Sequence, residues 1–413
     1  MSFENKGALA GERYRVIVTT DIGGSDYDDY QSMAHYLLYS DLFDTEGLIS
    51  SAWGRGTVWD IYQVLDCYER DYPNLLKYSD RYPTPDTLRK MTKQGAIKTA
   101  PYRGYTLPTE ASEWIIKCAR KEDDRPLYVL TWGLLEDLAQ ALHDAPDITP
   151  KLRVHYIGGP NKKWGPNAYE YIRRNFPDLW MIENNSSYRG WFNGGIQSAP
   201  WGNEAFMEIF AKGHGALGDF LYSHPGHAIR MGDTPTVAWL LYGNPAVPEN
   251  GGWGGQYDRV GDIMRVTYHG STSLKDTVEV FGTLELILRG PEYDGCGDEP
   301  AFMLETKEQL FPGFYCGNGE YRIRFVPKEV SEWQYVLHSD IKELNGQTGA
   351  FTSVPENPAT RTPQSGNLTS WWSDLLAPEF ADGPYKGTKT INRFRKDFLE
   401  DFAKRLERCC DTR

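Results

Sequence analysis

Four aspartates fall within nine positions of the segment VIVTTDIGGSDYDDYQSMAHYLLYS, residues 16–40. They are Asp21, Asp26, Asp28 and Asp29, and they lie between an apolar strand pattern and a helix pattern. Carboxylates this close to one another repel, so a nearby positive charge is needed to offset the repulsion. The segment therefore raises the question of which positive charge that is.

The residues alone leave two explanations open. Asp28 and Asp29 stand at the expected helix start, where carboxylates cap free backbone N–H groups and complement the helix dipole. Capping does not explain Asp21 and Asp26, and the Gly-Gly pair between them lets the backbone fold tightly enough for all four side chains to converge. Convergent carboxylate oxygens suit Ca²⁺ or Mg²⁺, so a metal site is the second explanation.

Short apolar segments alternate with helical patterns over the first 240 residues. This alternation predicts an α/β fold with a mostly parallel sheet flanked by helices on both faces. Ligands of such sheets bind beyond the carboxyl ends of the strands, and the aspartate loop follows the first strand. The expected strands are 15–20, 45–50, 126–131, 152–158 and 179–182, and the expected helices are 28–40, 57–70, 109–121, 134–143 and 167–175.

The pattern changes after about residue 266. Short strand-like segments separated by Gly, Pro and Asp turns predict an antiparallel β-sandwich over 268–356, without helices. Phe394, Phe398 and Phe402 recur every four residues near the end and predict a last amphipathic helix. We expect that helix to return to the α/β body, so the predicted domains are 1–267 with 357–413, and an inserted sandwich at 268–356.

The aspartate segment resembles the amino-terminal signature of nucleoside hydrolases, and more closely the nucleoside-hydrolase-like domain of cellulose-binding proteins. The resemblance rests on TTDIGGSDYDD and HYLLYSDLFDTEGLIS, followed in order by PLYVLTWGLLEDLAQAL, KLRVHYIGG, YIRRNFPDLWMI, GHGALGDFLY, GDTPTVAWLL, GGWGGQYDRV and NRFRKDFLEDFAKRL. It covers residues 14 to about 260 and resumes near 388. It implies a nucleoside-hydrolase-like fold and a Ca²⁺-dependent site that hydrolyses N- or O-glycosidic bonds.

The resemblance also implies a role for several residues. Asp21 would bind the metal and take the proton from its water, as the catalytic base. Asp28, Asp29 and Asp233 would be carboxylate ligands of the metal, and the main-chain carbonyl of Thr131 a further ligand. A cation held in this way can bind two vicinal hydroxyls of a sugar ring and lower the pKa of a water.

Further residues are expected to contact the substrate. Glu183 and Asn185 in MIENN match a Glu-x-Asn pair that holds sugar hydroxyls, and Asp26 is an extra carboxylate of the lengthened loop. Trp164 and Trp191, like Trp201 and Trp253, lie in polar Gly- and Asn-rich loops, where an indole either stacks on a sugar or pins its loop to the core. The complete expected substrate-binding set is Asp26, Asn161, Trp164, Glu183, Asn185, Trp191, His214 and His227.

Two departures from the nucleoside hydrolase pattern bear on the reaction. Six residues rather than three separate Asp21 from the aspartate pair, and Gly232 stands before Asp233 where nucleoside hydrolases carry a histidine near the leaving group. The usual acid is therefore missing. Three histidines in KGHGALGDFLYSHPGHAIR could supply a proton, although each could also be structural; they are His214, His224 and His227.

The sandwich segment resembles the Ig-like domain found ahead of catalytic barrels in certain glycoside hydrolases. The run FPGFYCGNGEYRIRFVPKEVSEWQYVLHS carries this resemblance, which strengthens the link to carbohydrate. The segment contains no obvious catalytic set. It could serve as a spacer or dimer contact, or as a wall added to the active site.

Composition limits the partners. The net charge is −13, so nucleic acid and anionic membranes are unsuitable, whereas the aromatic content of 14% fits either a carbohydrate ligand or aromatic-rich cores. Six scattered cysteines form no CxxC pair, and the N-terminus shows no apolar signal core, which predicts free thiols and a cytoplasmic location. A secreted chain trimmed of its signal would look the same. Nucleoside hydrolases commonly self-associate, so the resemblance leaves room for a homo-oligomer.

Three functions remain at this point. The first is a Ca²⁺-dependent glycoside hydrolase that acts on a saccharide or glycoside. The second is a carbohydrate-binding protein that keeps the metal site without turnover, which Gly232 favours. The third, disfavoured by the same glycine and by the lengthened loop, is a nucleoside N-ribohydrolase.

Overall fold

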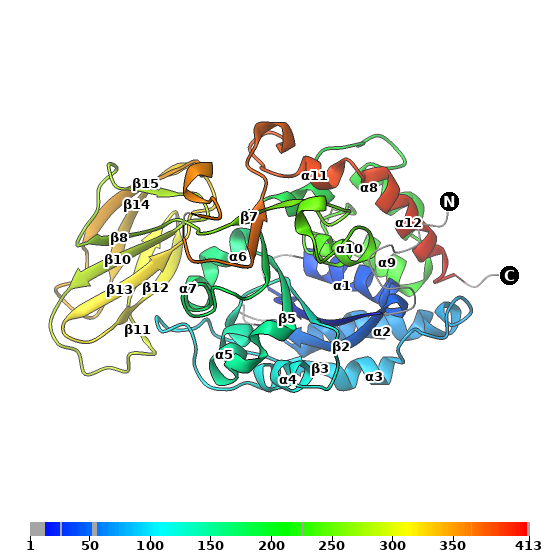
Figure 1. Ribbon diagram of the computed structural model, residues 1–413, viewed down its shortest axis with the longest axis horizontal. Coiled ribbons are helices and arrows are strands. Elements are labelled where there is room, and N and C mark those ends of the chain that lie inside the picture. Colours follow the sequence, from blue (N-terminus) through cyan, green and yellow to red (C-terminus); the bar gives the residue numbers. More distant parts are fainter. Residues whose placement is uncertain (1–12, 25–26, 52–55, 225, 365, 411–413) are drawn as a thin grey trace.

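A mostly parallel sheet forms the centre of the α/β body. The computed structural model describes residues 13–24, 27–51, 56–224, 226–364 and 366–410 (Figure 1). Within these ranges one eight-stranded sheet has the order β3-β2-β1-β4-β5-β6-β16-β7, and only β16 and β7 pair antiparallel. This confirms the predicted α/β class. The strands are β1 (Tyr14–Thr20), β2 (Phe43–Ser50), β3 (Thr92–Gln94), β4 (Leu127–Thr131), β5 (Leu152–Ile157), β6 (Met181–Asn184), β7 (Tyr257–Val260) and β16 (Trp371–Asp374).

Both faces of this sheet are buried because its strands are apolar on both sides. On β1, Val16 and Val18 enter one hydrophobic core, while Ile17 enters the other. Helices α4, α5 and α7 cover one face, and α1, α2, α9, α10 and α12 cover the other (Figure 1). The helices are α1 (Asp28–Leu38), α2 (Val58–Leu75), α3 (Pro85–Met91), α4 (Glu110–Ala119), α5 (Glu136–Asp144), α6 (Gly159–Trp164), α7 (Pro166–Asn175), α8 (Asn203–Phe206), α9 (Gly215–Ser223), α10 (Thr234–Leu241), α11 (Lys389–Asn392) and α12 (Arg395–Glu407). None of the helices in the described ranges is long and apolar enough to cross a membrane.

A second eight-stranded sheet follows in the chain, in the order β8-β10-β13-β12-β11-β14-β15-β9. It surrounds a separate aromatic core that includes Phe325, Trp333 and Phe351. The predicted antiparallel pairing is wrong at the two ends of the sheet, where β8 pairs parallel to β10 and β9 parallel to β15. The strands are β8 (Arg265–His269), β9 (Thr277–Glu279), β10 (Thr283–Arg289), β11 (Pro300–Thr306), β12 (Gln309–Tyr315), β13 (Glu320–Phe325), β14 (Ser331–His338) and β15 (Thr348–Val354).

The chain leaves the first sheet at β7 and returns to it at β16, which pairs with β7 itself. The second sheet therefore projects from the side of the α/β body (Figure 1). Buried polar contacts join the two parts: the Lys162 ammonium donates to the Phe281 carbonyl over 2.6 Å, and the Thr283 hydroxyl donates to Glu170 over 2.7 Å. The domain boundaries at 267 and 357 remain a prediction.

Candidate metal and substrate site

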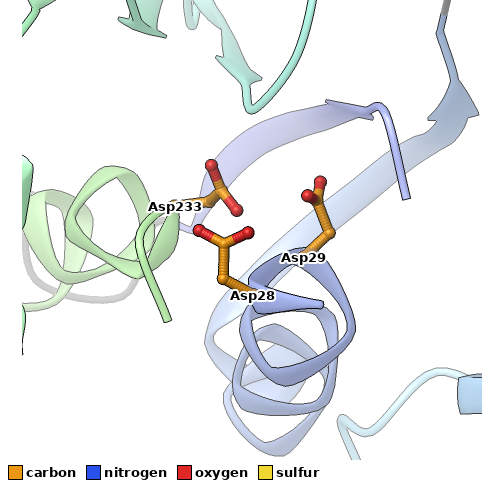
Figure 2. A group of neighbouring side chains, drawn as sticks. All are labelled: Asp28, Asp29 and Asp233. Carbon is orange, nitrogen blue, oxygen red and sulfur yellow. The ribbon is translucent and has the colours of Figure 1, made fainter. Parts of the chain in front are cut away.

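Three aspartates from two helix starts meet at the carboxyl edge of the first sheet. Asp28 and Asp29 open α1, and Asp233 directly precedes α10. One carboxylate oxygen from each lies within 4.8 Å of the others, although the residues are about 200 positions apart in the chain (Figure 2). The parallel register between Thr19 on β1 and Thr131 on β4 places Asp21, which follows β1, beside the end of β4. Figure 2 shows the carboxylates of Asp28 and Asp233 facing each other, with that of Asp29 beside them.

A small cavity of about 120 Å³ contains this cluster and Asp21. The other side chains around it are mostly aromatic or apolar, so the carboxylates are the main charged groups that it presents. Its walls come from the ends of β1, β4 and β5 and from the short helices that follow. The lining residues are Asp21, Asp28, Asp29, Trp132, Ile157, Pro160, Asn161, Trp164, Tyr188 and Asp233.

Two glycines make the cavity possible. A Cβ atom on Gly133 would lie 2.8 Å from the Cβ atom of Asp21, and one on Gly232 would lie 2.4 Å from Oδ2 of Asp28. Both distances are far shorter than carbon and oxygen atoms tolerate. A side chain at Gly232, where nucleoside hydrolases carry a histidine, would therefore displace the Asp28 carboxylate from its present position.

The donor set fits a hard divalent cation. Three carboxylates converge, two of them are buried, and a further carboxylate, Asp21, lines the same cavity. Calcium prefers a set of oxygen ligands of this kind, and the glycines leave space for an ion rather than for a side chain. Thr131, the carbonyl ligand that the resemblance implies, ends β4 in a fully buried position one residue before Trp132. The ligand roles of these residues remain predictions.

The expected substrate-binding residues separate into two groups. Asn161 and Trp164, both on α6, line the cavity. Asn161 donates to the carbonyls of Trp132 and Ile157, while Trp164 stacks on Phe311 of the second sheet with ring centres 5.1 Å apart. Asp26 lies outside the described residues.

Glu183 and Asn185 occupy a buried charge cluster instead of the cavity wall. Lys162 donates to Glu183 over 2.6 Å, with both side chains fully buried, and Tyr169 and Asn185 donate to the same carboxylate. Burial alone would raise the pKa of Glu183, but the Lys162 ammonium brings it below its ordinary value. These contacts use both carboxylate oxygens in holding β6 to α6 and α7, so the predicted sugar contact of this pair has no support in the geometry.

Trp191 is a core residue, which corrects its prediction as a stacking platform. Its side chain is 1% exposed and stacks on Phe398 of α12 with ring centres 3.8 Å apart. His35 packs edge-on against the same indole. Of the two alternatives for tryptophans in polar loops, pinning the loop to the core is the correct one at this position.

The expected histidines lie away from the cavity lining. His214 precedes α9 and contacts the Lys212 carbonyl, while the exposed His227 stacks on Tyr222. His224 is the histidine that packs near the aspartate loop, with its ring centre 6.0 Å from that of Tyr27. Burial lowers the pKa of His224, which keeps its ring neutral at physiological pH.

Sequence reasoning missed four lining residues: Trp132, Ile157, Pro160 and Tyr188. Trp132 directly follows β4, Ile157 ends β5 and Pro160 lies on α6 three residues later, so the strand-end rule could have found them. Tyr188 lies on η3 (Ser187–Trp191), a 3-10 turn in a segment that shows no periodicity.

The comparisons with known proteins agree with this architecture. Residues 15–257, more than half of the 413-residue chain, match the family described as cellulose-binding Sde182, nucleoside hydrolase-like domain. Residues 277–340 match DUF5060, a domain of unknown function. A comparison with curated proteins gave no match.

Solved structures show a similar fold. A nucleoside hydrolase-related hypothetical protein from Saccharophagus degradans, associated with carbohydrate metabolism, is 19% identical with a TM-score of 0.53, over 84% of this chain and 100% of that one. The purine-preferring ribonucleoside hydrolase from Gardnerella vaginalis is 11% identical with a TM-score of 0.44, over 95% and 99%. The inosine-uridine preferring nucleoside hydrolase from Bacillus anthracis is 14% identical with a TM-score of 0.40, over 61% and 86%. At 19% identity, the likeness to the Saccharophagus degradans protein establishes the fold alone.

Proposed function

This chain belongs to the family of cellulose-binding Sde182 proteins with a nucleoside hydrolase-like domain, and we propose that it is a Ca²⁺-dependent glycoside hydrolase acting on a saccharide or glycoside. The observation that supports this most is the convergence of Asp28, Asp29 and Asp233 beside Asp21 in one cavity. The position at the carboxyl ends of parallel strands is where this class of fold binds ligands.

The four aspartates hold the cation in this proposal, and Asp21 has a second task. Asp21, Asp28, Asp29 and Asp233 would be the carboxylate ligands of the cation, with the Thr131 carbonyl as a further ligand. A divalent cation bound there would supply the positive charge that engages vicinal sugar hydroxyls and makes a water more acidic. Asp21 accepts the proton of that attacking water, as a general base. The paired carboxylates also favour the positive charge that develops on the sugar ring as the glycosidic bond breaks.

The cavity walls position the reacting sugar. Trp164 and Tyr188 provide flat apolar surface on the cavity, and Asn161 is held by two backbone carbonyls at its base. A volume of about 120 Å³ is below the ~300–1,000 Å³ of typical ligand pockets. The cavity therefore takes the polar edge of one sugar ring, and the rest of the substrate lies outside it.

Replacing Asp21 by Asn tests the catalytic role directly. The amide cannot take a proton, so kcat on the best substrate from a panel of aryl glycosides and oligosaccharides should fall by about 100-fold or more while KM changes little. Asp86→Asn on the exposed start of α3 is the matched control and should keep full turnover. Unchanged kcat in Asp21→Asn would overturn the mechanism.

A carbohydrate-binding protein without turnover is the second candidate, because Gly232 replaces the usual acid. Within the described part of the chain no histidine lines the cavity. Tyr188 lines it and brings a phenolic O–H group to the cavity wall. In that case wild type shows no turnover on any glycoside, and Asp21→Asn changes only the affinity for sugar. A nucleoside N-ribohydrolase is the third candidate and would release free base from purine or pyrimidine ribonucleosides.

A further inference from the structure

A second, larger cleft lies at the junction of the two sheets. It has a volume of about 560 Å³ and lies within the usual range for ligand pockets. One wall comes from η3 and the loop before α11, and the other from turns of the second sheet. The lining residues are Ser186, Arg189, Val280, Phe281, Lys328, Glu329, Val330, Pro355, Glu356, Pro384, Tyr385 and Lys386.

Three cations line this cleft without an acidic partner. Among the residues that the structure describes, no carboxylate lies within ion-pair distance of Arg189, Lys328 or Lys386, although the protein as a whole carries a net charge of −13. An acidic protein would be expected to neutralise such a group from its own surface. The cleft therefore gathers three cations that form no ion pair, in a protein whose net charge is negative.

The two glutamates of the cleft are already engaged. The exposed Glu329 is paired with Lys307 over 2.8 Å. Glu356, whose side chain is 9% exposed, is paired with Arg361, and desolvation raises its pKa to about 7, so it carries only part of a negative charge near neutral pH. Neither carboxylate is available to balance Arg189.

Arg189 is held in position by aromatic rings. Its guanidinium carbon lies 4.5 Å from the ring centre of Tyr188 and 4.9 Å from that of Tyr385. Contact with two rings fixes the plane of the guanidinium while leaving N–H edges that can donate. A guanidinium prepared in this way suits a planar or tetrahedral anion, such as a carboxylate or a sulfate.

Tyr188 connects the cleft to the acidic cavity. Its ring lines the cavity that holds the aspartate cluster, and Arg189 stacks against the same ring. A sugar chain whose scissile bond lies at the aspartates can therefore continue past Tyr188 into the cleft. There the exposed ring of Tyr385 offers a stacking face for a sugar.

We propose that this cleft binds an anionic sugar residue, carrying a carboxylate or a sulfate, of a saccharide whose neighbouring bond lies at the aspartate cavity. The proposal rests on the proposed function for the position of the scissile bond. It assigns Arg189, Lys328 and Lys386 to recognition of the anion. The substrate class becomes an acidic oligosaccharide rather than a neutral glucan.

Isothermal titration of oligosaccharides into Asp21→Asn protein tests this without any need for turnover. The ligands are a uronic acid oligosaccharide, its carboxyl-reduced form, a sulfated oligosaccharide and its desulfated form. We expect an anionic ligand to bind at least about tenfold more tightly than its neutral form, with an affinity that falls as salt is raised. Whichever anionic ligand shows this difference identifies the anion as carboxylate or sulfate.

Variants locate the binding to the cleft. Arg189→Gln should weaken binding of the anionic ligand by about tenfold and leave the neutral form unchanged. Lys386→Gln should weaken it severalfold, and it keeps the test valid if the Arg189 variant fails to fold. Lys90→Gln, an exposed lysine on α3 without an ion pair in the described structure, is the charge-matched control and should have no effect.

Equal affinity for anionic and neutral ligands, or unchanged binding in both cleft variants, would overturn the proposal. Neither result would affect the proposed hydrolase activity, because that activity is tested by turnover and calcium binding. Conversely, binding of an acidic sugar that depends on Arg189, without any turnover, would support the cleft as the anion site. It would also favour the binding-protein alternative over the hydrolase.

Discussion

Two pockets of different charge are linked through one tyrosine: Tyr188 lines the aspartate cavity, and Arg189 of the cleft stacks on its ring. The aspartate cavity concentrates carboxylates and is too small for a whole sugar, whereas the adjoining cleft holds unpaired cations and is several times larger. In the cavity, repulsion between the carboxylates raises the free energy of the folded protein. In the cleft, a cation that becomes covered without a partner loses its hydration. A cation in the first and an anionic sugar in the second would offset both costs, and Tyr188 would separate the bond-breaking position from the recognition position.

The largest effect is expected from Asp28→Asn. Removing one charged ligand should weaken Ca²⁺ binding by about 100-fold, measured by calorimetric titration, and should abolish turnover with it. Without calcium, the variant should melt at or above the temperature of the wild type because one like-charge repulsion is gone. Asp86→Asn is the control, and calcium affinity equal to wild type in Asp28→Asn would show that the cluster is not the ion site.

Gly232→Ala should disturb the acidic cavity alone. Its Cβ would lie 2.4 Å from Oδ2 of Asp28, so the carboxylate has to move, and Ca²⁺ affinity should fall by about tenfold. Binding of an anionic sugar to the cleft should persist in the same variant. Gly297→Ala, in a loop of the second sheet where a Cβ has space, should change neither affinity. Calcium affinity equal to that of the wild type in Gly232→Ala would show that the Asp28 carboxylate does not lie this close to residue 232.

Trp164→Ala should weaken the joint between the two sheets. Its indole lines the aspartate cavity and stacks on Phe311, so its loss should raise KM severalfold and reduce the free energy of unfolding by about 1–3 kcal/mol. Kinetics and urea unfolding measure the two effects. Trp59→Ala, at an indole that is 70% exposed on α2, provides the control. An unchanged KM would remove Trp164 from the substrate site.

Glu136 shows how the fold treats a buried carboxylate that lacks a cation. It is fully buried on α5, burial raises its pKa to about 8, and Oε2 has no hydrogen-bond partner in the described structure. The folded protein therefore holds a proton there that the unfolded chain releases above pH 4.5, so this group reduces stability progressively as pH rises from about 4.5 to 8.

Glu136→Gln should remove this pH dependence without affecting either ligand. The variant's free energy of unfolding, relative to that of the wild type, should be a few kcal/mol higher at pH 8 than at pH 5. Its curve of unfolding free energy against pH should therefore be flatter. Glu113→Gln on the neighbouring helix α4 is the control. If the wild-type and Glu136→Gln curves run parallel between pH 5 and 8, Glu136 ionises normally in the folded state.

The sequence predicted the α/β body well because its signals are local. Strand β1 was expected at 15–20 and spans Tyr14–Thr20, and the first helix was expected at 28–40 and spans Asp28–Leu38. The aspartate loop could therefore be placed at the carboxyl edge of the sheet from the sequence alone. Asp233 could be added only from the resemblance, since nothing local indicates that a position about 200 residues away joins the cluster.

The misplaced residues depended on distant partners. Glu183 on β6 forms an ion pair with Lys162 on α6, and Trp191 stacks on Phe398 of α12. Neither contact leaves a local pattern in the sequence. Strand β16 is only four residues long and lies in a Pro- and Gly-rich passage, so its return to the first sheet left no periodic trace. The cleft escaped prediction for the same reason, because its two walls come from segments far apart in the chain.

The central claim is that the aspartate cavity binds calcium. The most direct test is the metal content of the purified protein after dialysis against calcium, together with its melting temperature with and without chelator. We predict one calcium per chain and a melting temperature several degrees lower in chelator, because an ion at about 100 times its dissociation constant adds about 2.7 kcal/mol. No bound calcium, and no change in melting temperature on its addition, would contradict the account.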